Sequence, residues 1–292
     1  FFFCILMSNY FTKNLVAPIE KMAENLSEPG TQAAYKELVP FMNKIRQQHE
    51  DILKSSQVRQ EFTANVSHEL KTPLTAISGY AELIEHGMAG DNAERFAAEI
   101  HKNASRLLSL INDILDMSRI ESGKIHLEEI PVDLDEEMEK IHAIVDVQAK
   151  EQEIRFSIED EVVHRQFLGS PAHLRRILLN LISNALRYNK KGGKICLAIR
   201  EVEYDGSHIG LEFKVQDTGI GMSKDFQEHM FEPFAQEKEM MQTVYSGTGL
   251  GLPIVKKIIE VMQGTIDYTS EKGKGTTFVI RLPFQNWQKS QG

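Results

Sequence analysis

The residue types best suited to chemistry lie together in the stretch Phe62–Leu74, which has His68 at its centre. Glu69 is the next residue, and Thr72 follows one helical turn later, on the same face of a helix. At about 100° per residue, His68 lies nearly opposite an apolar stripe and faces solvent. That stripe comprises Phe62, Val66, Leu70, Pro73, Ile77, Ala81 and Ile84. An exposed base, acid and hydroxyl could do chemistry together, although ordinary polar helix faces carry such triplets too.

A second polar group falls within the predicted helix Pro171–Tyr188. Asn180, Asn184, Arg187 and Tyr188 are spaced by four, three and one residues, so they project from a common side of the helix. Two amides, a guanidinium and a phenol could hold a metal ion and phosphates. An ordinary polar outer face is the alternative for any one of them.

Two short glycine-rich stretches follow this helix. In Asp217–Met222 (DTGIGM), the glycines let the backbone approach a ligand, and Asp217 can accept a hydrogen bond from an exocyclic amine. In Gly247–Leu252 (GTGLGL), glycine amides precede a helix, and such a helix start binds anions. The spacing and surroundings of GTGLGL are not those of the dinucleotide fingerprint. Each stretch is weak evidence alone.

The stretch Phe62–Leu74 resembles the H box of sensor histidine kinases, the membrane sensors of two-component signalling. The GHKL ATPase fold that these kinases share has N, G1, F and G2 boxes, and this chain resembles them in the same order at residues 180–188, Asp217–Met222, Phe231–Phe234 (FEPF) and Gly247–Leu252. The resemblance implies that ATP phosphorylates His68, that Glu69 orients and activates it, and that Thr72 positions a water that hydrolyses a phosphoaspartate. The matching H-box positions are Phe62, Ala64, Ser67, His68, Glu69, Leu70, Lys71, Thr72, Pro73 and Leu74.

The same resemblance assigns a nucleotide site. It implies that Asn184 supplies an oxygen to Mg²⁺, that Arg187 neutralises phosphates and that Tyr188 packs near the nucleoside, with Asn180 in support. Asp217 would read the adenine amino group. Lys238 is the only Lys or Arg of the expected lid, residues 235–245. The remaining implied ATP-binding positions are Gly219, Gly221, Phe231, Lys238, Gly247, Gly249, Leu250, Gly251 and Thr276.

The hydrophobic pattern predicts a multidomain protein with an all-α helical hairpin followed by an α+β two-layer sandwich. One helix runs from about Tyr35 to a turn near residues 86–91, and a second covers Asn92–Ile120. Because each helix has one apolar stripe, two hairpins are expected to pair as a dimeric four-helix bundle. Predicted strands are Lys124–Leu127, Ile154–Ile158, Gly193–Val202, Gly210–Asp217, Gly264–Ser270 and Thr276–Leu282, and the later helices are Leu134–Lys150, Pro171–Tyr188 and Pro253–Met262.

The composition of the chain limits the functions that it can have. With 33 basic and 42 acidic residues, the net charge of −9 disfavours a broad nucleic-acid surface. Cys4 and Cys196 form no disulfide or zinc pattern.

The apolar start FFFCILM is interpreted as the end of a truncated transmembrane helix at 1–11, with an apolar N-terminal core segment as the alternative. It is followed by a HAMP-like linker and signalling helix (12–57), the phosphotransfer hairpin (58–122) and the ATP-binding domain (123–288).

The predicted function is therefore that of a homodimeric histidine kinase at the cell membrane, with its kinase region facing the cytoplasm. It would use ATP and Mg²⁺ and pass the phosphoryl group to the receiver domain of a response regulator. The chain lacks the motifs of P-loop and Ser/Thr protein kinases, and His68 has no second histidine at zinc-protease spacing. A GHKL ATPase of another branch and a catalytically weak, ATP-binding signalling scaffold remain the alternatives.

Overall fold

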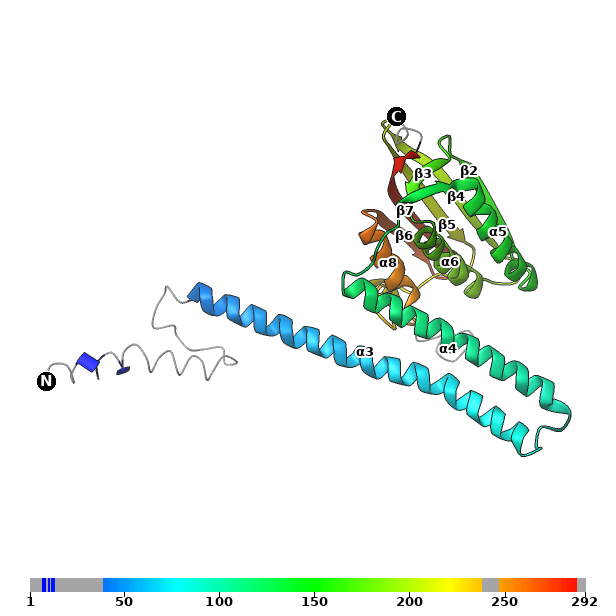
Figure 1. Ribbon diagram of the computed structural model, residues 1–292, viewed down its shortest axis with the longest axis horizontal. Helices are drawn as coiled ribbons and strands as arrows, with labels where there is room; N and C mark the ends of the chain where they lie inside the picture. Colours follow the sequence, from blue (N-terminus) through cyan, green and yellow to red (C-terminus); the bar gives the residue numbers. More distant parts are fainter. Residues whose placement is uncertain (1–6, 9, 11, 14–38, 238–246, 288–292) are drawn as a thin grey trace. The chain divides into compact units, whose positions relative to one another are not determined.

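The computed structural model describes residues 7–8, 10, 12–13, 39–237 and 247–287 (Figure 1). The chain divides into two compact units, Phe1–Val66 and Ser67–Gly292. Most of the expected membrane segment and of the HAMP-like linker, together with Lys238, lies outside the described residues. In the part of the chain that the structure describes, none of the helices combines the length and the hydropathy that a membrane span requires.

Helix α3 (Val39–Glu85) begins one residue before Pro40, where a missing backbone donor does no harm. Its first part, up to Val66, belongs to the first unit. Several large apolar side chains in this part are exposed, including Phe41, Ile52, Leu53 and Val58. The expected continuous helix leading into the H box is therefore present from residue 39 onward.

The turn after α3 begins at Gly87, which has a φ of +70°. Gly87 N–H donates to the Ile84 carbonyl and Met88 N–H to the Leu83 carbonyl, each at 3.0 Å, in the pattern of a Schellman cap. A short 3₁₀ turn, η3 (Gly90–Asn92), leads into α4 (Ala93–Glu121). The rings of Tyr80 and Phe96 lie 5.3 Å apart across the hairpin.

Helix α4 has two different apolar faces. One face of α4 is buried and comprises Leu110, Asp113, Met117 and Ile120. Helix α4 also contacts α8 (Gly251–Val261) of the following domain. The opposite side of α4 leaves Leu108 62%, Ile111 38% and Leu115 49% exposed. The first face therefore packs within the chain, and the second is unpartnered among the described residues.

The domain after the hairpin has a helical layer on one face of a mixed sheet (Figure 1). The strand order is β1-β3-β7-β5-β4-β2, with β6 also paired to β7; β2 runs parallel to β4, and the other described pairings are antiparallel. The strands are β1 (Ile130–Asp133), β2 (Arg155–Glu161), β3 (Gln166–Gly169), β4 (Lys194–Tyr204), β5 (His208–Asp217), β6 (Thr265–Glu271) and β7 (Gly275–Asn286). The helical layer consists of α5 (Leu134–Glu151), α6 (Pro171–Arg187) and α8.

The core lies between this sheet and α6. On β5, the residues Ile209, Leu211, Phe213 and Val215 are buried at every second position, as a strand with one covered face requires. The buried residues of α6 recur every three or four positions, which turns one stripe toward the sheet; they are Leu174, Ile177, Leu178, Leu181, Ile182, Ala185 and Leu186. The opposite side of α6 is thereby left for polar residues.

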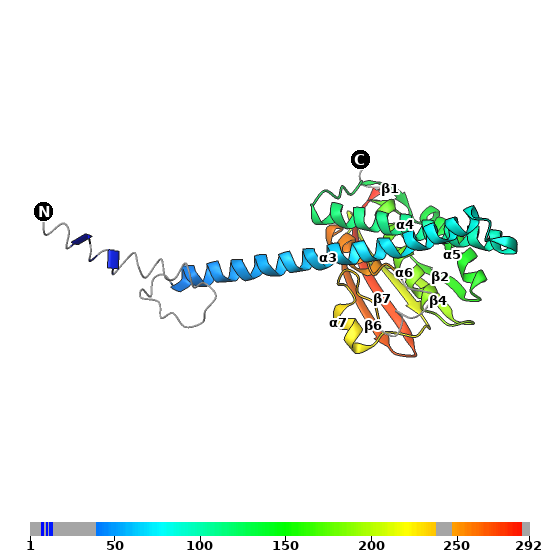
Figure 2. The same cartoon turned by 90° about the horizontal axis from the view of Figure 1, so that it is seen from below.

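The predicted strand Lys124–Leu127 is wrong, since these residues have no regular secondary structure. The strand at this place is β1, which was not predicted because Pro131 interrupts its pattern. Pro131 is tolerated since β1 lies at the edge of the sheet and pairs only with β3 in the described order. The four-residue β3 and the short helix α7 (Lys224–His229) were also missed. Helix α7 lies beside β6 (Figure 2), where Gln227 receives a hydrogen bond from Tyr268 on its carbonyl.

Candidate functional site

The side chain of His68 is 80% exposed, as its position opposite the apolar stripe predicted. Its Nδ1 lies 3.8 Å from Glu69 Oε1. The other carboxylate oxygen of Glu69 accepts a hydrogen bond of 3.4 Å from Arg106 on α4. The carboxylate is thus held from one side by a guanidinium, while its other oxygen faces the histidine.

Thr72 lies one turn after His68, and its hydroxyl donates to the His68 carbonyl at 3.2 Å. Pro73 is buried inside α3 and supplies no backbone N–H. In a regular helix that N–H would bond to the carbonyl four residues earlier, which is that of Glu69. The helix therefore lacks one backbone bond at the residue beside His68.

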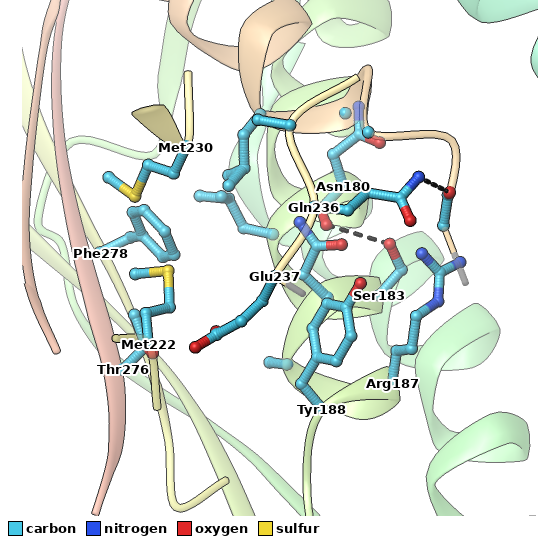
Figure 3. A pocket seen from close by; sticks show the side chains of 18 of the residues that line it. Asn180, Ser183, Arg187, Tyr188, Met222, Met230, Gln236, Glu237, Thr276 and Phe278 are labelled. Atoms are coloured by element: carbon cyan, nitrogen blue, oxygen red, sulfur yellow. Dashed lines mark hydrogen bonds between the residues drawn. The ribbon is translucent and has the colours of Figure 1, made fainter. Parts of the chain in front are cut away.

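A pocket opens between α6, the ends of β5 and β7, and the loops on either side of the undescribed residues 238–246. One wall is apolar and includes Met222, Met230 and Phe278 (Figure 3). The facing wall is the polar side of α6, with Asn180, Ser183 and Arg187. Such a combination of an apolar slot with polar groups at one end suits a ligand with a flat apolar part and a charged part.

The polar end is organised by α6 and the glycine loop before α8. A Cβ placed on Gly247 would lie only 2.4 Å from Arg187 Nη1, so the guanidinium occupies the space that a side chain there would need. Asn180 Nδ2 is buried and has no hydrogen-bond partner in the described part of the chain. A buried amide donor without a partner is costly, and a ligand acceptor in the pocket would satisfy it.

Asp217 lines the pocket at the end of β5, beside Thr276. Its Oδ1 accepts hydrogen bonds from the backbone N–H groups of Gly219 at 2.8 Å and Thr276 at 3.2 Å. Burial raises the pKa of Asp217 above its ordinary value, while these two hydrogen bonds act in the opposite direction. Since both bonds use Oδ1, neither occupies Oδ2.

The glycines in the first glycine-rich stretch serve the chain itself. A Cβ on Gly219 would lie 2.3 Å from the Tyr188 carbonyl oxygen, and one on Gly221 would lie 2.1 Å from the Glu271 carbonyl oxygen. In the second stretch, a Cβ on Gly249 would lie 2.7 Å from Phe234 Cα. These glycines were expected to let backbone approach a ligand; at these three positions the close neighbour is another segment of the same chain.

The residues expected to bind nucleotide fall into two groups in the structure. Ten line the pocket: Asn180, Asn184, Arg187, Tyr188, Asp217, Gly221, Gly247, Gly249, Gly251 and Thr276. Gly219, Phe231 and Leu250 do not. Leu250 is fully buried in the core, and Phe231 instead packs beside Tyr268, with Lys256 over its ring.

Several pocket residues were not expected from the sequence. Ser109 and Asp113 belong to α4, far from the other lining residues in sequence. Arg176 lies one turn before Asn180 on α6, and this i, i+4 spacing is the signal that could have revealed it. Gln236 donates to the Gly247 carbonyl at 2.8 Å and so joins the two loops.

Two families match the chain. Residues 169–286 match the family described as "Histidine kinase-, DNA gyrase B-, and HSP90-like ATPase", and residues 58–123 match the "His Kinase A (phospho-acceptor) domain". The chain is 33% identical over 237 residues to the Autoinducer 2 sensor kinase/phosphatase LuxQ of Vibrio parahaemolyticus. The matched stretch covers 81% of this chain but 28% of LuxQ, so this chain spans less than a third of that relative's length. This chain belongs to the sensor histidine kinases.

Solved histidine kinases share the fold. Full-length ShkA in complex with AMPPNP is 28% identical, with a TM-score of 0.56 over 78% of this chain and 46% of ShkA. Histidine kinase ThkA, solved in complex with response regulator protein TrrA, is 21% identical, with a TM-score of 0.58 over 85% of this chain and 67% of that chain.

The pocket fits the ATP that a histidine kinase uses. Asp217 is suited to receive the amino group of adenine, the apolar wall suits the base, and Arg187 and the Asn180 amide suit phosphates. Among the described residues, no three His, Cys, Asp or Glu side chains gather as a metal site. Asn184 lines the pocket, and its amide oxygen is, like the phosphates of a nucleotide, a ligand type that suits Mg²⁺.

We expect Gly221→Ala to destabilise the domain more than Gly273→Ala. Both glycines have a positive φ, +65° and +86°, but a Cβ on Gly273 would meet no atom within 4 Å. Gly273→Ala should lower the free energy of unfolding by about 1–2 kcal/mol, and Gly221→Ala by roughly 2–5 kcal/mol, since strain and collision add. Urea unfolding followed by circular dichroism measures both. Equal losses would show that the Glu271 carbonyl moves aside freely.

Proposed function

We propose that this chain is an ATP-dependent protein-histidine kinase that phosphorylates its own His68 and passes the phosphoryl group to an aspartate of a response regulator receiver domain. The observation that carries the proposal is an exposed histidine, with an oriented acid beside it, in the same chain as a pocket suited to ATP. In this proposal the bound Mg²⁺–ATP supplies the phosphoryl group.

His68 acts as the nucleophile through one ring nitrogen. Glu69 accepts a hydrogen bond from the other ring nitrogen, which fixes the tautomer and makes the attacking nitrogen more nucleophilic. The 3.8 Å separation between Nδ1 and Oε1 is longer than a hydrogen bond, so this role requires one of the two side chains to rotate toward the other. Phosphoryl transfer asks mainly for position and charge neutralisation, and Arg187, Asn184 and Asn180 supply these at the phosphate end.

Arg106 has a positioning role in this proposal. Its guanidinium holds one oxygen of Glu69, so the other oxygen stays on the His68 side. Arg106 does not line the nucleotide pocket. Its contribution should therefore affect the rate of phosphoryl transfer rather than the binding of ATP.

The hairpin also supports pairing with a second copy of the chain. Leu108, Ile111 and Leu115 form an exposed stripe on α4, and Leu74 and Ile84 are exposed on α3. Large apolar side chains gathered on one element favour burial against a partner. A homodimeric four-helix bundle would cover them, and the receiver domain would then approach the exposed side of α3 at His68.

Other parts of the proposal rest on the sequence alone. The location at a cell membrane depends on the apolar start at residues 1–7, and the linker at 12–57 has only a loose HAMP-like pattern. The boundaries 58–122 and 123–288 remain predictions of the sequence. A phosphatase activity is supported by Thr72 one turn from His68 and by the relative LuxQ, which is called a sensor kinase/phosphatase.

The central test is labelling of the 292-residue protein with Mg²⁺ and γ-labelled ATP. We expect a label that is labile in acid and stable in alkali, as for phosphohistidine, and that disappears in His68→Gln. His101→Gln is the matched control, because His101 is an exposed histidine of the same hairpin and should keep the label. Unlabelled protein that still binds ATP would instead favour the signalling scaffold or an ATPase of another branch.

Arg106→Ala should lower the maximal rate of His68 labelling by about tenfold, because Glu69 loses its orientation. The KM for ATP should stay within about twofold, because the nucleotide pocket is untouched. Arg106→Lys keeps the positive charge but loses the planar guanidinium, so its maximal rate should lie between those of the unaltered protein and Arg106→Ala. Arg95→Ala, at an exposed position of α4, serves as control. A rise in KM with no loss of maximal rate would contradict the positioning role.

Thr72→Ala should keep His68 labelling and lose most of the phosphatase activity toward a phosphorylated receiver domain, because the hydroxyl no longer orients the attacking water. Thr75→Ala, which changes another exposed threonine of α3, should keep both activities. Release of phosphate from the labelled receiver domain measures the effect. The role assigned to Thr72 fails if its variant dephosphorylates the regulator at the normal rate.

A further inference from the structure

Asp113 is an acid in an unexpected place. It lies on the face of α4 that packs against the ATPase domain, and its side chain is only 10% exposed. Its Oδ1 lies 2.5 Å from Arg176 Nη2, and its Oδ2 accepts a hydrogen bond of 3.1 Å from the Thr248 hydroxyl. A buried carboxylate requires such partners because its desolvation is costly.

These partners belong to the phosphate end of the nucleotide pocket. Thr248 is part of the glycine loop before α8, next to Gly247, against which the Arg187 guanidinium lies. Arg176 and Asp113 themselves line the same pocket. We call Arg176, Arg187 and Thr248 the anion surface. It carries two guanidinium groups and a hydroxyl donor, and the carboxylate of α4 is bound to it.

The electrostatics of Asp113 agree with this arrangement. Burial raises the pKa of Asp113 above its ordinary value, and the nearby charges of Arg176 and Arg187 act in the opposite direction. The guanidinium charges thus compensate part of the cost of burying a carboxylate. A nucleotide phosphate is also an anion and would be attracted by the same two guanidinium groups.

We propose that Asp113 and the phosphates of the nucleotide are alternative ligands of the anion surface, so that nucleotide binding releases α4 from the ATPase domain. The inference deepens the proposed function and rests on it, because it takes ATP as the ligand of the pocket. Competition makes the coupling reciprocal: docked α4 weakens nucleotide binding by the same factor by which nucleotide weakens docking.

Asp116 offers a matched comparison. Its carboxylate also contacts Arg176 Nη2, at 2.9 Å, from the same helix. It does not line the pocket and makes no described contact with Thr248. The loss of Asp116 therefore removes an ion pair of the docked face without removing the carboxylate that competes with phosphate.

The test is the Kd of a fluorescent ATP analogue, measured with Mg²⁺ on the 292-residue protein. Asp113→Asn keeps the size of the side chain and an oxygen for Thr248 but removes the charge, and it should lower the Kd by about tenfold. Asp116→Asn should change the Kd by less than about twofold. An unchanged or higher Kd in Asp113→Asn, with normal binding by the unaltered protein, would overturn this inference and leave the proposed function standing.

A second measurement follows the docking itself. Energy transfer is measured between dyes on Ser78→Cys of the hairpin and Val163→Cys of the ATPase domain, two exposed positions, in a chain without its own cysteines. The transfer efficiency should change on addition of the analogue at concentrations that match its Kd. Constant efficiency at saturating analogue would refute the release of α4. If the unaltered protein binds no analogue at all, the proposed function and this inference both fail.

Discussion

The two-sided environment of α6 is the constraint on which the rest of the molecule depends. Its apolar stripe is buried against the sheet, and this burial fixes the rotation of the helix about its own axis. The rotation in turn aims Asn180, Asn184 and Arg187 into the pocket. A polar site built on a helix of this kind is as rigid as the core beneath it, so the position of the phosphate-end groups is set by hydrophobic packing.

Helix α4 makes a comparable connection for the hairpin. Its residues divide among three tasks: Arg106 holds the acid beside His68, one stripe packs on the ATPase domain, and another stays exposed. Because Arg106 and the two stripes share one rigid helix, a rotation or shift of α4 would alter all of them together. His68, the pocket and the face available for pairing are therefore mechanically linked through a single element.

The sequence was sufficient to predict the helices and strands in which apolar residues recur at a regular spacing. The hairpin, α6, and the alternating strands β4 and β5 were predicted within a few residues, and the family was identified correctly. The edge strand β1 and its neighbour β3 were missed because they are short, because β1 contains a proline, and because their pairing depends on the finished sheet. Asp113 was missed because its contacts join residues 63 and 135 positions apart, which no local pattern encodes.

The glycines of the first glycine-rich stretch, Asp217–Met222, affect how an inactive relative of this chain would be recognised from its sequence. Gly219 and Gly221 are required where one backbone segment touches another, whether or not a nucleotide ever binds. A descendant that had lost phosphoryl transfer would still need both glycines in order to fold. Their persistence in such a pseudoenzyme would report an intact scaffold, whereas Asn184 and Arg187, which project into the pocket, would be free to drift. Loss of activity should be recognised at the amide and the guanidinium, and not at the glycines.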